Sequence, residues 1–170
     1  MKIKFRNILR ISFFMILCLI VVVIILRYDG YERRALLFEL TREFTFVYIV
    51  SVELTLSLIK NYKSFNKLWK KIFIYAVSGF AMFSVFLFII DIYNLSMDAF
   101  VLGYHSKEVM IIDRYRQYRS SDRVRVEVDG EIHMYSLYPG YTEAETGKSY
   151  QANLFSMSKI LIAVKESNED

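Results

Sequence analysis

The chain has 170 residues, 55% of them hydrophobic, and a formal net charge of +4. It is more apolar than a soluble domain of this length usually is, which excludes an ordinary soluble globular protein. The charge is uneven, because residues 1–90 carry 13 Lys and Arg against 5 Asp and Glu, whereas residues 91–170 carry 9 against 13. The basic excess therefore belongs to the apolar half of the chain and gives no support to nucleic-acid binding.

Three apolar segments in the first half predict an integral membrane protein. A helix needs about 20 apolar residues to cross the bilayer core, and we expect spans at about residues 8–26, 44–59 and 72–90. The first span follows a basic arm like that of a signal peptide, but no small residues suited to cleavage follow it, which favours an uncleaved helix. The second span is short and polar in its middle, so a re-entrant segment is its alternative.

The distribution of Lys and Arg near the spans predicts the topology. Four lie in the N-terminal arm and five in the linker 60–71, against four in the loop 27–43 and one soon after the third span. The positive-inside rule then places the N-terminus and the linker in the cytoplasm. With three spans, the prediction is a multi-pass protein of the cell membrane whose C-terminal domain is extracytoplasmic.

The basic linker has a second interpretation. Its aromatic and apolar residues recur at helical spacing, so it would lie in the interface as an amphipathic turn, with its lysines on anionic headgroups. The simpler interpretation is a topology signal alone. The lysines concerned are Lys60, Lys63, Lys67, Lys70 and Lys71.

From about residue 100 onward the pattern changes from helical to alternating, which predicts strands. Residues 123–128 alternate valine with charged side chains, and residues 131–138 form the returning strand of a hairpin. We expect further strands at residues 108–113, 150–155 and 159–165.

The register of the hairpin is open at this point. Asp129 and Gly130 form a strong turn signal between the two strands. A two-residue turn places Val126 opposite His133, whereas a longer or bulged turn aligns the valines with Ile132 and its neighbour Met134.

The predicted architecture has two regions. Residues 1–95 form a membrane region of three helices, and residues 96–170 form a small antiparallel β domain, an SH3-like or OB-like barrel or sheet with a frayed C-terminal tail. The single cysteine, Cys18, lies in the first span, so no disulfide can stabilise the β domain. A domain this small would gain stability by docking against its own membrane helices.

One ionisable residue lies near the middle of the second span. Glu53 is followed one turn later by Ser57, and a carboxyl group inside a membrane needs a partner. It would serve as an ion or proton site, as a contact to a membrane-embedded partner, or as a protonated or hydrogen-bonded group that fastens the helices together. The last of these is favoured.

Arginine and tyrosine alternate in the segment 113–123. Neither face of this segment is apolar, so we expect a protruding ribbon or loop that could bind a protein, because Arg and Tyr dominate binding hot spots. The competing interpretation is a strand edge protected by charge. The residues are Arg114, Tyr115, Arg116, Tyr118, Arg119 and Arg123.

The sequence contains no pattern that predicts catalysis or metal binding. The two histidines, His105 and His133, have no Cys partner and no ligand-like spacing. No nucleophile elbow, phosphate-binding glycine loop or zinc-protease motif is present. We therefore expect no catalytic residue, no metal and no cofactor.

The sequence thus predicts a non-enzymatic integral membrane protein whose β domain binds a protein partner at the cell envelope, as a complex subunit or an immunity-type protein. One alternative is an ion or proton pathway formed by a homo-oligomer around Glu53. Another is an inverted topology that makes the β domain a cytoplasmic adaptor. The expected partners are the lipid bilayer and a protein, and not nucleic acid.

Overall fold

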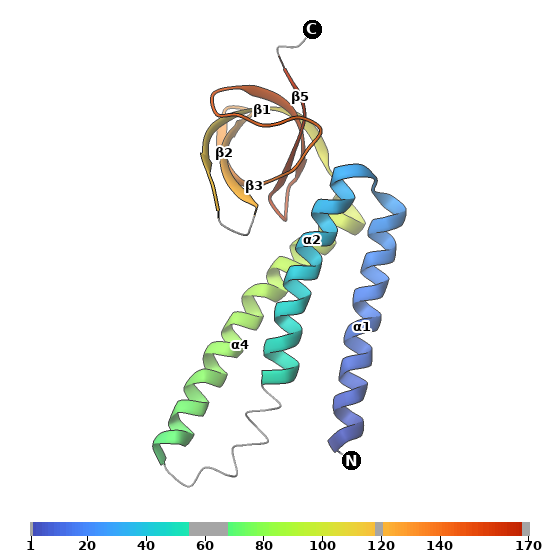
Figure 1. Ribbon diagram of the computed structural model, residues 1–170, viewed down its shortest axis with the longest axis vertical. Coiled ribbons are helices and arrows are strands. Elements are labelled where there is room, and N and C mark those ends of the chain that lie inside the picture. The colour runs from blue at the N-terminus through green and yellow to red at the C-terminus, as the bar shows by residue number, and fades with distance from the viewer. Residues whose placement is uncertain (1, 55–67, 118–120, 168–170) are drawn as a thin grey trace. The chain divides into compact units, whose positions relative to one another are not determined.

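The computed structural model describes residues 2–54, 68–117 and 121–167, and consists of helices followed by a five-stranded sheet (Figure 1). The helical elements are α1 (Lys2–Arg27), α2 (Gly30–Val47), the π-helical turn η1 (Tyr48–Leu54), α4 (Leu68–Met97) and the π-helical turn η2 (Asp98–Leu102). The strands are β1 (His105–Tyr115), β2 (Asp122–Val128), β3 (Glu131–Tyr138), β4 (Ser149–Phe155) and β5 (Ile160–Glu166).

The chain forms two compact units that do not follow the order of the sequence. The first, the helical unit, contains Met1–Val22 and Glu39–Tyr93. The second, the barrel unit, contains Asn94–Asp170 together with Val23–Phe38, which is the end of α1 and the first half of α2.

In the helical unit, α2 contacts both other helices. The ring of Phe13 in α1 lies 5.2 Å from that of Phe44 in α2, and Phe46 of α2 stacks on Phe88 of α4 at 4.0 Å. The turn η1, which follows the C-terminal end of α2, contacts the N-terminal part of α1, because Arg10 donates a hydrogen bond to Glu53. Helix α2 therefore runs antiparallel to α1. It also runs antiparallel to α4, because Arg42 lies near Asp91 while the later Phe46 meets the earlier Phe88. Consequently α1 and α4 run parallel.

Of the three predicted apolar spans, two are found among the described residues. Two helices there are long and apolar enough to cross a membrane, over Arg10–Arg27 and Leu68–Leu102. The predicted middle span, 44–59, falls partly on α2 and η1 and partly outside the described residues. The helix that contains the start of this predicted span, α2, is too polar to be a candidate span. It carries the charged residues Glu32, Arg33, Arg34, Glu39, Arg42 and Glu43.

The five strands form a closed barrel in the order β1-β2-β3-β5-β4. The sheet is mixed and not antiparallel as predicted, because β3 and β5 pair in parallel over Ser136–Tyr138 and Ile160–Ile162. This pairing is possible because β5 has no polar face: Ile160, Leu161, Ile162 and Ala163 are all buried. Strands in parallel pairs are typically buried on both faces in this way.

The hairpin between β2 and β3 has the two-residue turn. Val126 lies opposite His133, and Val124 lies opposite Tyr135. Asp129 and Gly130 adopt φ angles of 54° and 81°, the left-handed conformation that the mirror-image hairpin turns require at both positions.

The barrel interior is filled by alternate residues of all five strands. On β1, a register shift between Ile111 and Asp113 bends the strand, which pairs with β4 before the shift and with β2 around and after it. The interior residues are Val109, Ile111, Val124, Val126, Val128, Tyr135, Leu137, Ala144, Tyr150, Ala152, Leu154, Leu161 and Ala163.

Within the barrel unit, the helical segments cover the outer face of β4 and β5. Phe155 of β4 is fully buried, and its ring lies 5.8 Å from that of Tyr28 and 5.9 Å from that of Tyr104. Phe38 of α2 meets Tyr138 at the end of β3, with ring centroids 6.1 Å apart. Burying this face agrees with the need of a small, disulfide-free barrel for additional apolar contacts.

Two buried carboxylates fasten the helical segments to the barrel. Asp98, at the start of η2, is fully buried and accepts hydrogen bonds from the backbone N–H of Met157 at 3.1 Å and of Ser158 at 2.6 Å, and from the Ser158 hydroxyl at 2.7 Å. Glu32 of α2 accepts hydrogen bonds from the Asn153 amide at 2.7 Å and the Tyr141 hydroxyl at 3.1 Å. Hydrogen bonds to buried charges are among the stronger ones in proteins.

Candidate functional site: the outer face of strands β1 to β3

The outer face of β1, β2 and β3 carries large apolar side chains that the described chain does not cover. Ile132 is 60% exposed and Met134 50% exposed on β3, and Tyr115 is 47% exposed on β1. Their neighbours across the sheet are Glu127 for Ile132, Arg125 for Met134 and Arg123 for Tyr115. We call this surface the β1–β3 face, which consists of Met110, Tyr115, Arg123, Arg125, Ile132 and Met134.

The alternation of each strand explains why these side chains lie together. Val124, Val126 and Val128 point into the barrel, so Arg123 and Arg125 point outward beside the outward positions of β3. Side chains on directly opposed residues lie close enough to contact one another. The face therefore combines two arginines with flexible apolar groups and one aromatic ring.

The charges of this face are nearly balanced. Arg125 forms an ion pair with Asp113, and the hydrogen bond that it donates to this carboxylate raises the pKa of the Arg125 guanidinium. Arg123 is exposed and makes no ion pair with any residue that the structure describes. Glu127 adds a negative charge between the apolar groups. The face thus has no basic excess of the kind that a phosphate backbone would require.

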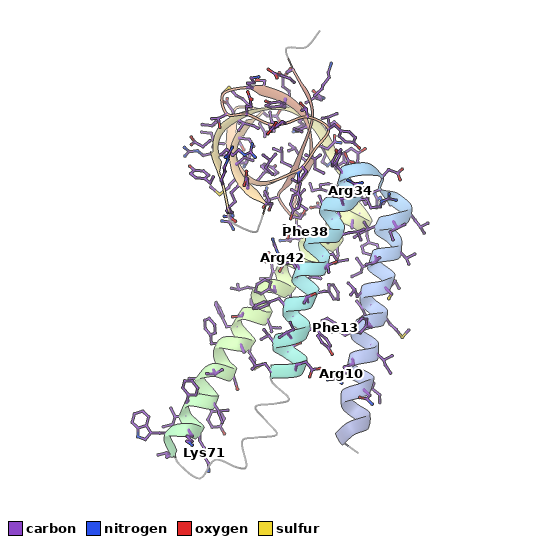
Figure 2. All side chains as sticks on the ribbon, viewed as in Figure 1. Arg10, Phe13, Arg34, Phe38, Arg42 and Lys71 are labelled. Atoms are coloured by element: carbon purple, nitrogen blue, oxygen red, sulfur yellow. The ribbon has the colours of Figure 1, made fainter. Side chains whose placement is uncertain are left out.

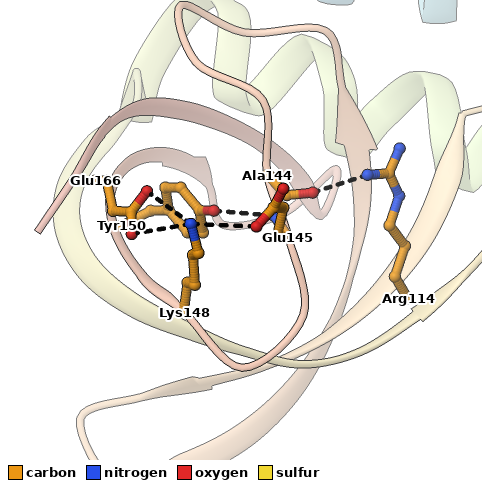
Figure 3. A network of polar contacts seen from close by, with 6 residues as sticks. All are labelled: Arg114, Ala144, Glu145, Lys148, Tyr150 and Glu166. Atoms are coloured by element: carbon orange, nitrogen blue, oxygen red, sulfur yellow. Dashed lines mark hydrogen bonds and ion pairs between the residues drawn. The ribbon is translucent and has the colours of Figure 1, made fainter.

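The structure divides the predicted Arg/Tyr ribbon. Tyr115 and Arg123 belong to the β1–β3 face, and Arg116 is exposed at the end of β1. Arg114 instead turns inward: its Nε donates to Asp122 at 2.7 Å and its Nη1 donates to the Ala144 carbonyl at 2.7 Å (Figure 3). The remaining two predicted residues, Tyr118 and Arg119, lie outside the described residues.

The ion pair between Arg114 and Asp122 is partly buried at one mouth of the barrel. Burial of the Asp122 carboxyl raises its pKa, but the hydrogen bonds from Arg114 and the Gln117 backbone lower it further, so the net shift is downward. Asp122 therefore stays ionised to a lower pH than a free carboxyl group does. The pair anchors the start of β2 to the loop between β3 and β4.

That loop is held by a small polar network (Figure 3). The Glu145 backbone N–H donates to the Tyr150 hydroxyl at 2.9 Å, and Lys148 pairs with Glu145 at 3.1 Å and with Glu166 at 3.2 Å. The hydrogen bonds that Lys148 donates to these two carboxylates raise the pKa of its amine. The loop is therefore an ordered part of the barrel, and it borders a pocket of about 470 Å³ at this mouth.

The other mouth of the barrel brings the two histidines to one place. His105 and His133 both line a pocket of about 430 Å³, together with Lys107 and Tyr135. A hydrogen bond to Asp129 raises the pKa of the Lys107 amine, and burial raises the pKa of the Tyr135 phenol. Among the described residues, no group of three His, Cys, Asp or Glu side chains is arranged to hold a metal ion.

Glu53, in η1, has two partners in the helical unit. The Nε of Arg10 and the hydroxyl of Tyr48 each donate to its Oε1 at 2.9 Å. A charged partner from α1 is what this carboxylate would need if it lay within a membrane. Ser57, the residue predicted to accompany Glu53, lies outside the described residues.

The predicted lipid-contacting lysines are described only in part. Lys70 and Lys71 lie in the first turn of α4, where Trp69 is 83% exposed. The other three, Lys60, Lys63 and Lys67, lie outside the described residues.

Sequence reasoning missed several of the residues that the structure brings forward. Asp98 and Glu32 gave no signal, because each finds its partners more than 50 residues away in the sequence. Ile132 and Met134 did give a signal in the sequence. With a two-residue hairpin turn, both are apolar residues at outward positions of β3. An apolar residue at an outward strand position indicates either a covering element or a binding surface.

Comparison of the chain with protein-family models, with curated proteins and with solved structures finds no match. The function must therefore be inferred from the site itself.

Proposed function

We propose that the chain is a non-enzymatic, multi-pass membrane protein whose barrel binds a protein partner through the β1–β3 face. The observation that carries this proposal is the exposure of Met110, Tyr115, Ile132 and Met134 on one side of a small barrel whose opposite outer face is covered. Contiguous apolar patches on soluble surfaces mark interaction sites. The partner would be a protein of the cell envelope, with this chain as a complex subunit or an immunity-type protein.

The barrel is of the OB-like rather than the SH3-like kind in this proposal. A closed five-stranded order of β1-β2-β3-β5-β4, with β3 parallel to β5, supports this assignment. In OB-like barrels the surface of the second and third strands is the usual ligand-binding face. The β1–β3 face occupies that position here.

The chemistry of the face favours a protein over a nucleic acid. Methionine, tyrosine and arginine are enriched in protein interfaces, and methionine adapts its shape to its partner. A nucleic-acid surface needs a run of cations that track the phosphates. On the β1–β3 face, Arg125 is neutralised by Asp113, and Glu127 lies beside the apolar groups.

The direction of the helices supports the predicted topology. Because α1 and α4 run parallel, two helices that both cross the bilayer would cross it in the same direction. The chain between them must then return across the membrane, through α2, η1 and the residues that follow. Three crossings would put the N-terminus and the barrel on opposite sides of the membrane, and the distribution of basic residues favours the N-terminus in the cytoplasm.

A polar middle helix can cross only if its charges are paired. Arg42 forms ion pairs with Glu39 and Glu43, and Arg10 pairs with Glu53. Glu39 and Glu43 are also buried within the helical unit. Pairing of this kind is how ionisable residues are accommodated at membrane depth, and it supports a fastening role for Glu53 over an ion pathway.

Paired C-terminal fusions test the topology. One reporter should be active only outside the cytoplasmic membrane and the other only inside it. We expect activity from the outside reporter fused after Asp170 and from the inside reporter fused in the linker 60–67. The opposite pattern would invert the topology and move the search for partners to the cytoplasm.

Substitutions on the β1–β3 face test the binding. We expect Ile132→Glu combined with Met134→Glu to abolish co-purification of the partner from solubilised membranes, because two carboxylates would be buried without partners. Val101→Glu is the control, since Val101 is 61% exposed, as Ile132 is, but lies in η2, away from the face. An unchanged set of co-purified proteins in the double variant would refute the proposal.

A further inference from the structure

We propose that the partner on the β1–β3 face is the same face of a second copy of this chain, turned end to end. This assignment rests on the proposed function, because it names the partner of the same surface. The charges of that surface carry it, since they are complementary to themselves when the strands of the two copies run in opposite directions.

The outward side chains of the three strands form three rows across the sheet. In each row, a residue of β2 stands between its register partners on β1 and β3, so the surface has nine outward positions. From the turn between β2 and β3 onward, the rows are Met110, Glu127 and Ile132; Asp113, Arg125 and Met134; and Tyr115, Arg123 and Ser136.

Strand β2 carries opposite charges in the two outer rows. Arg123 and Glu127 are four residues apart, so their Cα atoms lie about 13 Å apart at a rise of about 3.3 Å per residue. Neither side chain forms an ion pair with any residue that the structure describes. Between them, Arg125 is neutralised by Asp113. The surface is therefore positive in one outer row, neutral in the middle row and negative in the other outer row.

Two copies of this surface repel one another in one orientation and attract in the other. If the strands of both copies run in the same direction, Arg123 faces its own counterpart and so does Glu127, and like charges that face each other oppose association. If the second copy is turned end to end, Arg123 of each copy faces Glu127 of the other. The middle row then lies on a two-fold axis, which is the commonest symmetry of protein dimers.

The end-to-end orientation also covers the exposed apolar side chains. Met110 and Ile132 lie in one outer row, and Tyr115 lies in the other. Met110 of each copy therefore faces Tyr115 of the other, and contacts between sulfur and aromatic rings are favourable. Met134, in the middle row, faces Met134 of the second copy. The same arrangement thus accounts for the exposed apolar groups and for the two unpaired charges.

The small size of the surface predicts a weak and reversible dimer. A stable interface uses about 20–30 residues on each partner, whereas this surface offers nine outward positions. Sheets that pack face to face lie about 10 Å apart, which exceeds the Cα separation of about 7 Å that a disulfide can bridge. A thiol-reactive cross-linker with a short spacer is therefore the suitable probe of this dimer.

The test is cross-linking of the full chain in the membranes of cells that produce it. Cys18→Ser removes the single cysteine, and Met134→Cys provides one in the middle row, next to the proposed two-fold axis. We expect a short bis-maleimide to join two copies of this parent variant into a dimer that a denaturing gel resolves. In the co-purification experiment above, two differently tagged chains produced together would reveal the same partner.

Charge reversal in the parent variant tests the orientation. We expect Arg123→Glu alone, or Glu127→Arg alone, to lower the initial rate of cross-linking about tenfold, because each replaces both ion pairs by like charges. The two reversals combined should restore the parent rate, since the pairs form again with their charges exchanged. A circular-dichroism melting curve of each variant checks that it is folded.

The matched control is Arg34→Glu, which makes the same exchange of charge at another exposed arginine. Arg34 lies on α2 (Figure 2) and forms no ion pair with any described residue. It is not one of the nine outward positions. We therefore expect Arg34→Glu to leave the rate of cross-linking unchanged.

Two results would overturn the inference. Equal rates in the parent and in both single reversals would show that two copies meet through another surface. Absence of the dimer in the parent would show that the occupant is not a second copy. In that case the proposed function stands if Ile132→Glu combined with Met134→Glu still removes a different co-purified protein, and it fails as well if no protein is removed.

Discussion

The outer face of β4 and β5 and the outer face of β1 to β3 both carry large apolar side chains, but the chain's own helical segments cover only the first. Phe155 and Ile162 on the covered face are fully buried. Ile132 and Met134 on the other face are at least half exposed. The two faces belong to one barrel with one continuous interior, so the difference lies in what packs outside it.

This difference separates apolar residues that stabilise the fold from those available for binding. The covered face is joined to helices by buried carboxylates, Asp98 and Glu32, as well as by aromatic contacts. The β1–β3 face has arginines and an ion pair but no covering element within the described residues. Substitutions should therefore cost stability on one face and binding on the other.

The largest difference should come from truncating one apolar side chain on each face. We expect Phe155→Ala to lower the free energy of unfolding of the barrel by about 3–5 kcal/mol, through lost contacts and a cavity. Met134→Ala should change it by less than about 0.5 kcal/mol, because its side chain is already half in water. Denaturant unfolding of the full chain in detergent measures both. Similar losses would mean that the two faces are not different.

The next largest effect should come from the carboxylate that joins η2 to the β4–β5 turn. Asp98→Ala removes the acceptor of three hydrogen bonds, and we expect a loss of about 3 kcal/mol. Asp129→Asn is the control, since Asp129 is an exposed turn residue whose partner is Lys107, and asparagine tolerates its left-handed conformation. A wild-type melting temperature for Asp98→Ala would show that this joint does not stabilise the barrel.

A smaller and pH-dependent effect is expected at the barrel mouth. Asp122→Asn removes the negative charge that pairs with the half-buried Arg114. We expect the free energy of unfolding to fall by about 1–3 kcal/mol at neutral pH. The pKa of Asp122 is lowered from 3.8 in the folded protein, so the pair stabilises the fold fully above about pH 4. This contribution is lost as the pH falls through the lowered pKa.

The wild-type protein and the Asp122→Asn variant should therefore converge in stability in acid. Urea unfolding at a series of pH values from neutral to below 4 measures the gap between them. A gap that stays constant over this range would show that the Asp122 carboxylate is not the group that titrates.

The smallest effect is expected at the edge of the covered region. Tyr141→Phe removes the hydroxyl that donates to Glu32, which keeps its second bond from Asn153. Because Tyr141 is 54% exposed, we expect a loss of only about 0.5–1 kcal/mol. A loss as large as that of Phe155→Ala would indicate that the joint depends on this hydroxyl and not on apolar packing.

Local sequence patterns were sufficient to predict the strands of the hairpin and the turn between them. The valines of β2 and the turn at Asp129 and Gly130 predict strands that the structure places at Asp122–Val128 and Glu131–Tyr138. The alternation is strong there because one side of each strand is in the barrel and the other is not covered. The turn is left-handed at both Asp129 and Gly130, a two-residue hairpin conformation, and Val126 lies opposite His133.

Local sequence patterns did not predict the features that depend on packing between residues distant in the sequence. The parallel pairing of β3 with β5 depends on burial of both faces of β5, and one of those faces is buried by helical segments. The inclusion of Val23–Phe38 in the barrel unit depends on Glu32 and Tyr28, which bond to Asn153 in β4 and to Asp98 in η2. No local period reports such contacts, because they are set by the tertiary fold.

The central claim is that the β1–β3 face is covered by a protein partner at the cell envelope. Photo-cross-linking tests it directly: a benzophenone amino acid is placed at Ile132, or at Met157 as the control, in the full chain in intact cells. We expect one discrete protein adduct from position 132, its loss when Met134→Glu is added, and no adduct from position 157. The absence of an adduct at position 132, or equal adducts at both positions, would contradict the account.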